Sequence, residues 1–152
     1  MKKGKAFVLV SHRRWGKSTT LTSLTGGMAR RIYIDGTRIV VRRMSNDEDD
    51  QGFFHLLEYT YPDAQPYVVL AMCPTFKEDR RRLPLIANLT SFSKRYDLFF
   101  FVLGRLDAKS GKRVAEHEIE AMKKFGPVEI FTRSIEADSR ARAFKKFIVE
   151  RM

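Results

Sequence analysis

The sequence predicts an α/β fold in three layers, with a mostly parallel β-sheet, one antiparallel hairpin strand, and helices on both faces. Apolar runs that suit buried strands alternate with segments of helical apolar spacing, which is typical of strand–helix–strand units. The alternation is interrupted once, where Asp35-Gly36 joins two β-rich runs and indicates a β-hairpin. With 152 residues and 43% hydrophobic content, residues 1–152 are expected to form a single domain with its own core.

The expected elements follow one another in a regular order. The strands are residues 6–10, 31–34, 37–44, 67–73, 97–103 and 128–132, and the helices are residues 19–24, 53–61, 83–92, 114–125 and 138–151. Asp138 is expected to cap the last helix, because Asp is a favoured residue before a first helical turn. Ligands of parallel α/β sheets bind outside the carboxyl ends of the strands. The segments expected together at that edge are residues 11–19, 47–50, 73–76 and 104–107.

The segment between the first strand and the first helix reads SHRRWGKST. A tight loop that leads into a helix points its backbone N–H groups at one place, where the helix dipole also favours an anion. The residues expected to hold phosphates there are Ser11, His12, Arg13, Arg14, Trp15, Gly16, Lys17, Ser18 and Thr19. Lys17 would reach the outer phosphates, and the Ser18 hydroxyl would ligate Mg²⁺. Arg13 and Arg14 either add charge near the phosphates or point to solvent, and Arg14 is the candidate to act in catalysis with Lys17.

In these residues the sequence resembles the P-loop NTPase superfamily, which implies Mg²⁺ together with ATP or GTP. The family pattern opens with glycine, whereas this chain has Ser11. A non-glycine residue held at positive φ costs about 1–2 kcal/mol. The loop is therefore expected either to tolerate that strain or to bend differently.

The order of the elements, with a hairpin after the first helix, also resembles that of Ras-like small GTPases. Gly104-Arg105-Leu106-Asp107 stands where that family has Asn-Lys-x-Asp, and only Asp107 matches. Asp49-Asp50-Gln51-Gly52 fits the family's Asp-x-x-Gly. The resemblance implies that Asp49 orients the water on Mg²⁺ and that Asp107 accepts hydrogen bonds from guanine. Arg105 would instead stack on a purine of either kind, so adenine and guanine both stay open.

Two other P-loop groups share features with the chain. Residues 32–36 and 73–80 are similar to segments of small sulfate-activating kinases, which implies Asp35 as an acceptor-side carboxylate and residues 80–82 as a lid. Asp35 needs no such role, because Asp-Gly is also an ordinary hairpin turn. Partitioning-type ATPases have a comparable C-terminal half and bind DNA through basic surface.

The positive charge is concentrated in the first third of the chain. Residues 1–43 hold eleven Lys and Arg residues and one acid, so they carry +10 of the net charge of +11. Such an asymmetry attracts polyanions, and the candidate partners are a nucleic acid, an acidic protein and the nucleotide itself. A solvated surface that only aids solubility explains it equally well. A homo-oligomer is also left open.

The cysteine content and the length of the apolar runs indicate the cellular compartment in which the protein is expected. Cys73 is the one cysteine, so no internal disulfide forms and a reducing, cytoplasmic location is expected. No histidine is paired with Cys73 in the sequence, and a small core residue is therefore the expected role. The apolar runs are far shorter than the roughly 20 residues of a membrane-spanning helix, so no membrane partner is expected.

The sequence thus predicts a basic domain that binds a nucleoside triphosphate with Mg²⁺ and hydrolyses it or uses it as a switch. One alternative is a nucleic-acid-binding or assembly module with a degenerate loop. A further alternative is a small-molecule kinase.

Overall fold

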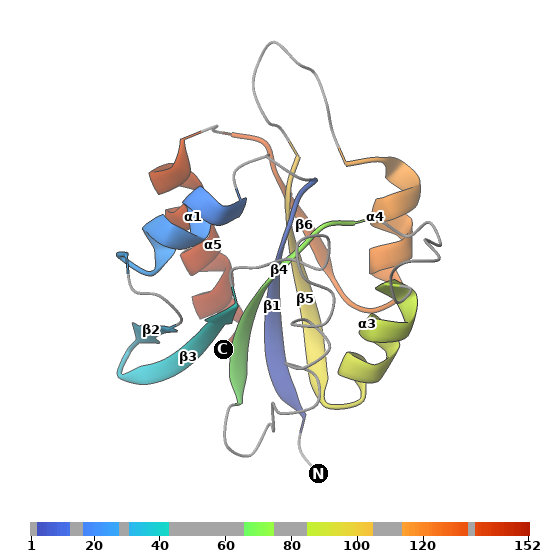
Figure 1. The fold of residues 1–152 in the computed structure, drawn as a ribbon, viewed down its shortest axis with the longest axis horizontal. Helices are drawn as coiled ribbons and strands as arrows, with labels where there is room; N and C mark the ends of the chain where they lie inside the picture. Colours follow the sequence, from blue (N-terminus) through green and yellow to red (C-terminus); the bar gives the residue numbers. More distant parts are fainter. Residues whose placement is uncertain are drawn as a thin grey trace.

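The computed structural model describes residues 3–12, 17–27, 31–42, 66–74, 85–104, 114–133 and 136–152. Its strands are β1 (Gly4–Val10), β2 (Arg31–Ile34), β3 (Thr37–Arg42), β4 (Tyr67–Met72), β5 (Tyr96–Leu103) and β6 (Val128–Phe131). Its helices are α1 (Lys17–Leu24), α3 (Leu85–Ser93), α4 (Glu116–Lys123) and α5 (Ala137–Arg151). The described strands form one six-stranded sheet in the order β2-β3-β4-β1-β5-β6 (Figure 1).

The sheet is parallel except at one edge. β1 pairs in parallel with β4 on one side and with β5 on the other, and Val10 is level with both Met72 and Val102. β3 and β6 extend the parallel arrangement outwards, while β2 runs antiparallel to β3. The predicted mostly parallel sheet with one antiparallel hairpin strand is confirmed.

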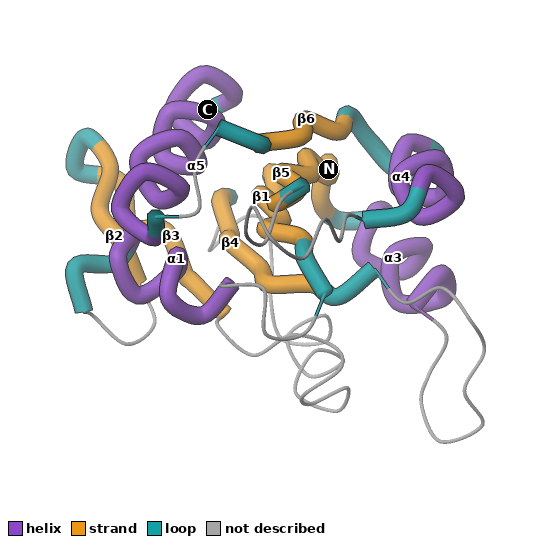
Figure 2. The backbone as a smooth tube through the Cα atoms, turned by 90° about the horizontal axis from the view of Figure 1, so that it is seen from above, coloured by secondary structure: helices purple, strands orange, loops and turns teal. Residues whose placement is uncertain are grey.

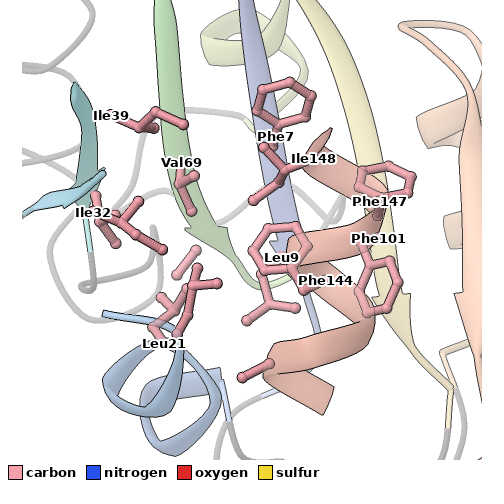
Figure 3. Close-up of a cluster of buried hydrophobic side chains, with 14 of the residues drawn as sticks. Phe7, Leu9, Leu21, Ile32, Ile39, Val69, Phe101, Phe144, Phe147 and Ile148 are labelled. Atoms are coloured by element: carbon pink, nitrogen blue, oxygen red, sulfur yellow. The ribbon is translucent and has the colours of Figure 1, made fainter. Parts of the chain in front are cut away.

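The helices cover both faces of the sheet, as predicted. Figure 2 shows α1 and α5 on one side and α3 and α4 on the other. Successive side chains of a strand point to opposite faces, so Ala6, Val8 and Val10 join the core beside α3 and α4. Phe7 and Leu9 join the second core beside α1 and α5 (Figure 3). Burial on both faces explains why β1 appears in the sequence as an uninterrupted apolar run.

The second core is rich in aromatic residues. Phe101 of β5 packs against Phe144 and Phe147 of α5, with ring centroids 5.2 Å apart in both pairs. Phe7 of β1 also meets Phe147 edge to face at 6.4 Å. These contacts hold α5 against the middle of the sheet and so fix the face on which α1 also lies.

Some sequence-based boundaries and roles are wrong. Asp138 does not cap α5, because the helix begins at Ala137 after Glu136, and the Asp138 carboxylate instead accepts a hydrogen bond from the Ser23 hydroxyl at 2.6 Å. α4 begins two residues later than expected, since Ala115 is still extended. Ile86 of α3, an apolar residue within the helix expected over residues 83–92, is 50% exposed. The helix expected over residues 53–61 and the strand end at residues 43–44 lie outside the described residues.

Of the helices that the structure describes, none combines the length and the apolar character needed to cross a bilayer.

Candidate functional site

The loops that follow the central strands leave the sheet at the same edge. β1, β4 and β5 are parallel and in register, so Ser11, Cys73 and Gly104 come directly after three adjacent strand ends. The Ser11 N–H still donates to the Met72 carbonyl at 3.2 Å, and the Gly104 N–H donates to the Phe131 carbonyl at 3.0 Å. The next described helix after β1 is α1, on one face of the sheet, whereas the next after β4 is α3, on the other face (Figure 2). Such a divergence at the carboxyl edge is where open α/β sheets bind ligands.

The Lys17 ammonium lies at this edge. Lys17 is the first residue of α1 and is only 6% exposed. Its Nζ donates to the Ser11 carbonyl at 2.5 Å and to the His12 carbonyl at 3.3 Å. A buried ammonium is costly unless it is hydrogen-bonded, and these two carbonyls supply the bonds. The positive charge is therefore fixed between the end of β1 and the start of α1.

The start of α1 adds to the positive potential. The first N–H groups of a helix have no partner within the helix, and they form the positive end of its dipole. The first turn of α1 contains no acidic residue that would neutralise it. The Thr20 hydroxyl in this turn is also buried without a hydrogen-bond partner among the described residues. The geometry and charge of the turn suit an anion.

Ser11 does not carry the strain that its place in the motif suggested. Among the described residues, Asp35 is the one non-glycine residue with a positive φ. Ser11 thus leaves β1 without entering the left-handed region, and the expected cost of about 1–2 kcal/mol does not arise there. Its side chain is fully buried, and its hydroxyl donates to the His12 carbonyl at 3.2 Å. Ser11 therefore needs no glycine-like backbone conformation at the end of β1.

His12 joins the loop to two distant elements, which the sequence did not reveal. Its Nε2 lies 2.9 Å from the Glu118 Oε1 on α4, and its Nδ1 lies 3.8 Å from the Cys73 Sγ at the end of β4. Glu118 is almost fully buried, and the same Oε1 accepts a hydrogen bond from the Ala115 N–H at 2.9 Å. The expectation that no histidine pairs with Cys73 is wrong. The one local signal for Glu118 was its place as the third residue of a helix, where Glu often bonds back to the chain.

Asp35 lies at the wrong edge of the sheet for a role beside phosphates. It forms the β2–β3 turn with Gly36, and their φ values are 51° and 77°. The turn precedes β3, and β3 is parallel to β4 and β1, so the turn is at the amino edge. The register separates Thr37 from the level of Ser11 by eight residues, or about 26 Å along the strands. The acceptor role implied by the kinase resemblance is therefore wrong for Asp35.

Many of the predicted site residues are not covered by the described part of the chain. Those outside it are Arg13, Arg14, Trp15, Gly16, Asp49, Arg105, Asp107 and residues 80–82. Ser18 and Thr19 lie in the first turn of α1, and Thr19 is exposed. The roles of all these residues stay predictions. Within the described ranges, no group of three or more His, Cys, Asp or Glu side chains is arranged to hold a metal ion.

Comparison with known proteins agrees with this geometry at the level of the fold. No family model matches the sequence, and no curated protein matches it. The structure is similar to that of the G-domain of FeoB from Methanococcus jannaschii, with a TM-score of 0.52. The match covers 98% of this chain and 97% of the other, at 18% sequence identity.

The fold is that of a P-loop NTPase. The resemblance predicted from the Gly-Lys-Ser segment is thereby confirmed, as is the three-layer architecture. The stretch between β1 and α1 stands where the sequence predicts a P-loop, and the role of Lys17 there belongs to the proposal below. Nucleotide binding, the identity of the base and the fate of the nucleotide belong to the proposal below.

Proposed function

We propose that the protein binds a nucleoside triphosphate with Mg²⁺ at the carboxyl edge of β1 and hydrolyses it, either in turnover or as a switch. The observation that carries the proposal is the buried Lys17 ammonium, held on the Ser11 and His12 carbonyls at the first residue of α1. Replacing buried charged groups by well-packed hydrophobic residues is often neutral or stabilising, so stability does not explain a lysine buried here. A charge kept at a P-loop position is instead suited to triphosphate oxygens.

Hard oxygen donors suit Mg²⁺, and two are available to it on this proposal. The Ser18 hydroxyl, in the first turn of α1, would hold the ion directly, and Asp49 would orient a water on it. Bound in this way, Mg²⁺ would neutralise charge on the β- and γ-phosphates. The chain's own part is to position the triphosphate with its loop amides and to place the charges of Lys17 and Arg14 where negative charge develops.

We rank GTP ahead of ATP, on the likeness to a G-domain. Asp107 would then accept hydrogen bonds from the base, and Arg105 would lie along its plane. Residues 1–152 act on this proposal as one nucleotide-binding domain in the cytoplasm.

A panel of ligands tests the proposal. The thermal unfolding midpoint is measured with ATP, GTP and their diphosphates, each with Mg²⁺ and again with EDTA. Ligands that bind only the folded state raise the midpoint, and at one hundred times Kd the gain is about 2.7 kcal/mol. We expect a rise with GTP and Mg²⁺ and a smaller one with EDTA, and release of inorganic phosphate shows hydrolysis.

Two substitutions at Lys17 connect the result to the P-loop. Lys17→Ala and Lys17→Met are both expected to fold and to lose the nucleotide-dependent rise. Lys123→Ala is the matched control, because its ammonium is exposed and lies beside Glu120 at the C-terminal end of α4. Unchanged nucleotide affinity in folded Lys17→Ala protein, or no response to any nucleotide, would refute the proposal.

A further inference from the structure

The β2–β3 hairpin has one buried face and one outward face. Ile32, Ile34, Ile39 and Val41 point into the core shared with α1 and α5. The alternate residues form the hairpin outer face, which consists of Arg31, Tyr33, Arg38, Val40 and Arg42. Across the two strands Arg31 is opposite Val40, and Tyr33 is opposite Arg38. Directly opposed residues of an antiparallel pair lie about 4.5–5.5 Å apart at Cβ, so the Tyr33 ring has a guanidinium-bearing neighbour.

The hairpin outer face is accessible, and all its charged side chains are positive. Arg31 and Arg38 are exposed, Tyr33 is 51% exposed, and Val40 and Arg42 are half-buried. None of the five residues is acidic. Helices α3 and α4, which lie towards this side of the sheet, pack over β5 and β6 at its other end (Figure 2). The face therefore presents an aromatic ring among arginines at the edge of the fold.

Protection of an edge strand explains only part of this composition. A charged residue on the edge strand β2 would discourage pairing with another chain, and Arg31 serves that purpose. An exposed tyrosine does the opposite, because it adds apolar surface to the same edge. A second copy of the chain that docks with the same face is also a poor occupant, since it would bring positive charges towards positive charges. The charge instead suits a polyanion, and the ring suits a flat apolar group.

We propose that the hairpin outer face binds single-stranded nucleic acid. Tyr33 would stack on a base, while Arg31 and Arg38 would contact the phosphates on either side, with a guanidinium also able to lie on a base. A duplex keeps its bases stacked on one another, so Tyr33 would add nothing to its binding. An acidic peptide would engage the arginines but offers no base to the ring. This function is independent of the nucleotide site, whose P-loop begins at the far end of a different strand.

Binding is tested with the full chain and a fluorescein-labelled 12-nucleotide oligo-dT by fluorescence anisotropy between 50 and 200 mM NaCl. Tyr33→Ala is expected to weaken binding roughly 5- to 100-fold, the range for losing one stacked base. Tyr33→Phe keeps the ring and is expected to retain binding. The double variant R31Q/R38Q is expected to weaken binding and to reduce the slope of log K against log salt by about 1.4, or about 0.7 for each phosphate contact.

Matched controls separate this face from general basicity. The double variant R142Q/K145Q removes the same charge from exposed positions on α5, and Ile130→Ala removes an exposed apolar side chain from the other edge strand. Both are expected to bind within about twofold of wild type. Each variant is also melted and titrated with GTP and Mg²⁺, which separates a failure here from a failure at the P-loop.

Three outcomes would overturn the proposal. In the first, folded Tyr33→Ala protein binds oligo-dT as wild type does. In the second, R142Q/K145Q weakens binding as much as R31Q/R38Q, which would leave only the net charge of +11 as the cause. In the third, a 12-base-pair duplex or a poly-glutamate peptide binds as tightly as oligo-dT and loses as much affinity with Tyr33→Ala.

Discussion

Glu118 connects the start of α4 to His12 in the segment that follows β1, and replacing Glu118 tests this connection. In Glu118→Ala two interactions of one carboxylate oxygen disappear, those with the Ala115 N–H and with His12 Nε2, both at 2.9 Å. The carboxylate is 9% exposed and the His12 side chain is 32% exposed. Loss of a buried hydrogen bond to a charged acceptor costs about 1.5–3 kcal/mol. The half-exposed histidine can be rehydrated, so its contact contributes at most about 1 kcal/mol.

We therefore expect Glu118→Ala to lower the free energy of unfolding by about 2–3 kcal/mol, measured by urea denaturation at pH 7. At roughly 2–4 °C for each kcal/mol in a domain of this size, the unfolding midpoint falls by about 5–10 °C. Glu118→Gln keeps an acceptor for the Ala115 N–H and loses only the charge. Its expected cost is below about 1 kcal/mol.

The same helix offers a matched control. Glu120 is two residues away, is exposed, and lies 3.2 Å from the exposed Lys123. Glu120→Ala is expected to change stability by no more than about 0.5 kcal/mol, because surface ion pairs contribute little. A double-mutant cycle between His12→Ala and Glu118→Ala then isolates the contact itself, with an expected coupling of at least about 0.5 kcal/mol. Equal stability of Glu118→Ala and Glu120→Ala, or additivity in the cycle, would refute the reasoning.

Two further predictions concern the packing of the sheet. A Cβ on Gly126 would overlap the carbonyl oxygen of Leu98, so Gly126→Ala should lower the free energy of unfolding by about 2–4 kcal/mol in a urea titration. Gly36→Ala is the comparison, because a Cβ at Gly36 would meet open space and only the positive φ is unfavourable. If Gly36→Ala lowered the free energy of unfolding more than Gly126→Ala does, this account would be wrong. Burial, opposed in part by nearby Arg95, raises the pKa of Tyr96 from 10.0 to about 12. The folded state holds the Tyr96 proton more tightly than the unfolded state does. The resulting gain in the free energy of unfolding is complete below pH 10, and about 2–3 kcal/mol of it is lost as pH rises to 12. Urea titrations from pH 10 to 12 should show that the free energy of unfolding falls less steeply with pH in Tyr96→Phe than in wild type or in the exposed-site control Tyr33→Phe. Equal slopes in all three proteins would contradict the raised pKa of Tyr96.

Much of the fold could be predicted because the relevant signals are local. β1 is buried on both faces, so every residue from Ala6 to Val10 is apolar, and the run stands out without any knowledge of its neighbours. Asp35-Gly36 supplies the positive φ values of its turn from two adjacent residues. The Gly-Lys-Ser segment after β1 was likewise sufficient to predict a P-loop NTPase fold.

The parts that could not be predicted depend on contacts between distant residues. His12 and Glu118 are 106 positions apart, and they meet only because β1 lies at the centre of the sheet and α4 packs beside its carboxyl end. Asp35 looked suitable for an acceptor site until the parallel register of β3 placed its turn at the opposite edge.

By itself, then, the sequence determined the order of strands and helices, the hairpin turn, and a lysine between the first strand and the first helix. Secondary-structure propensity and hydrophobic periodicity act over a few residues, so these features can be recognised from short stretches of the sequence. The tertiary structure alone decided which carbonyls hold Lys17, which carboxylate anchors His12, and which hairpin residues face outward together. Those outcomes depend on sheet order, register and packing, which no short stretch of residues encodes.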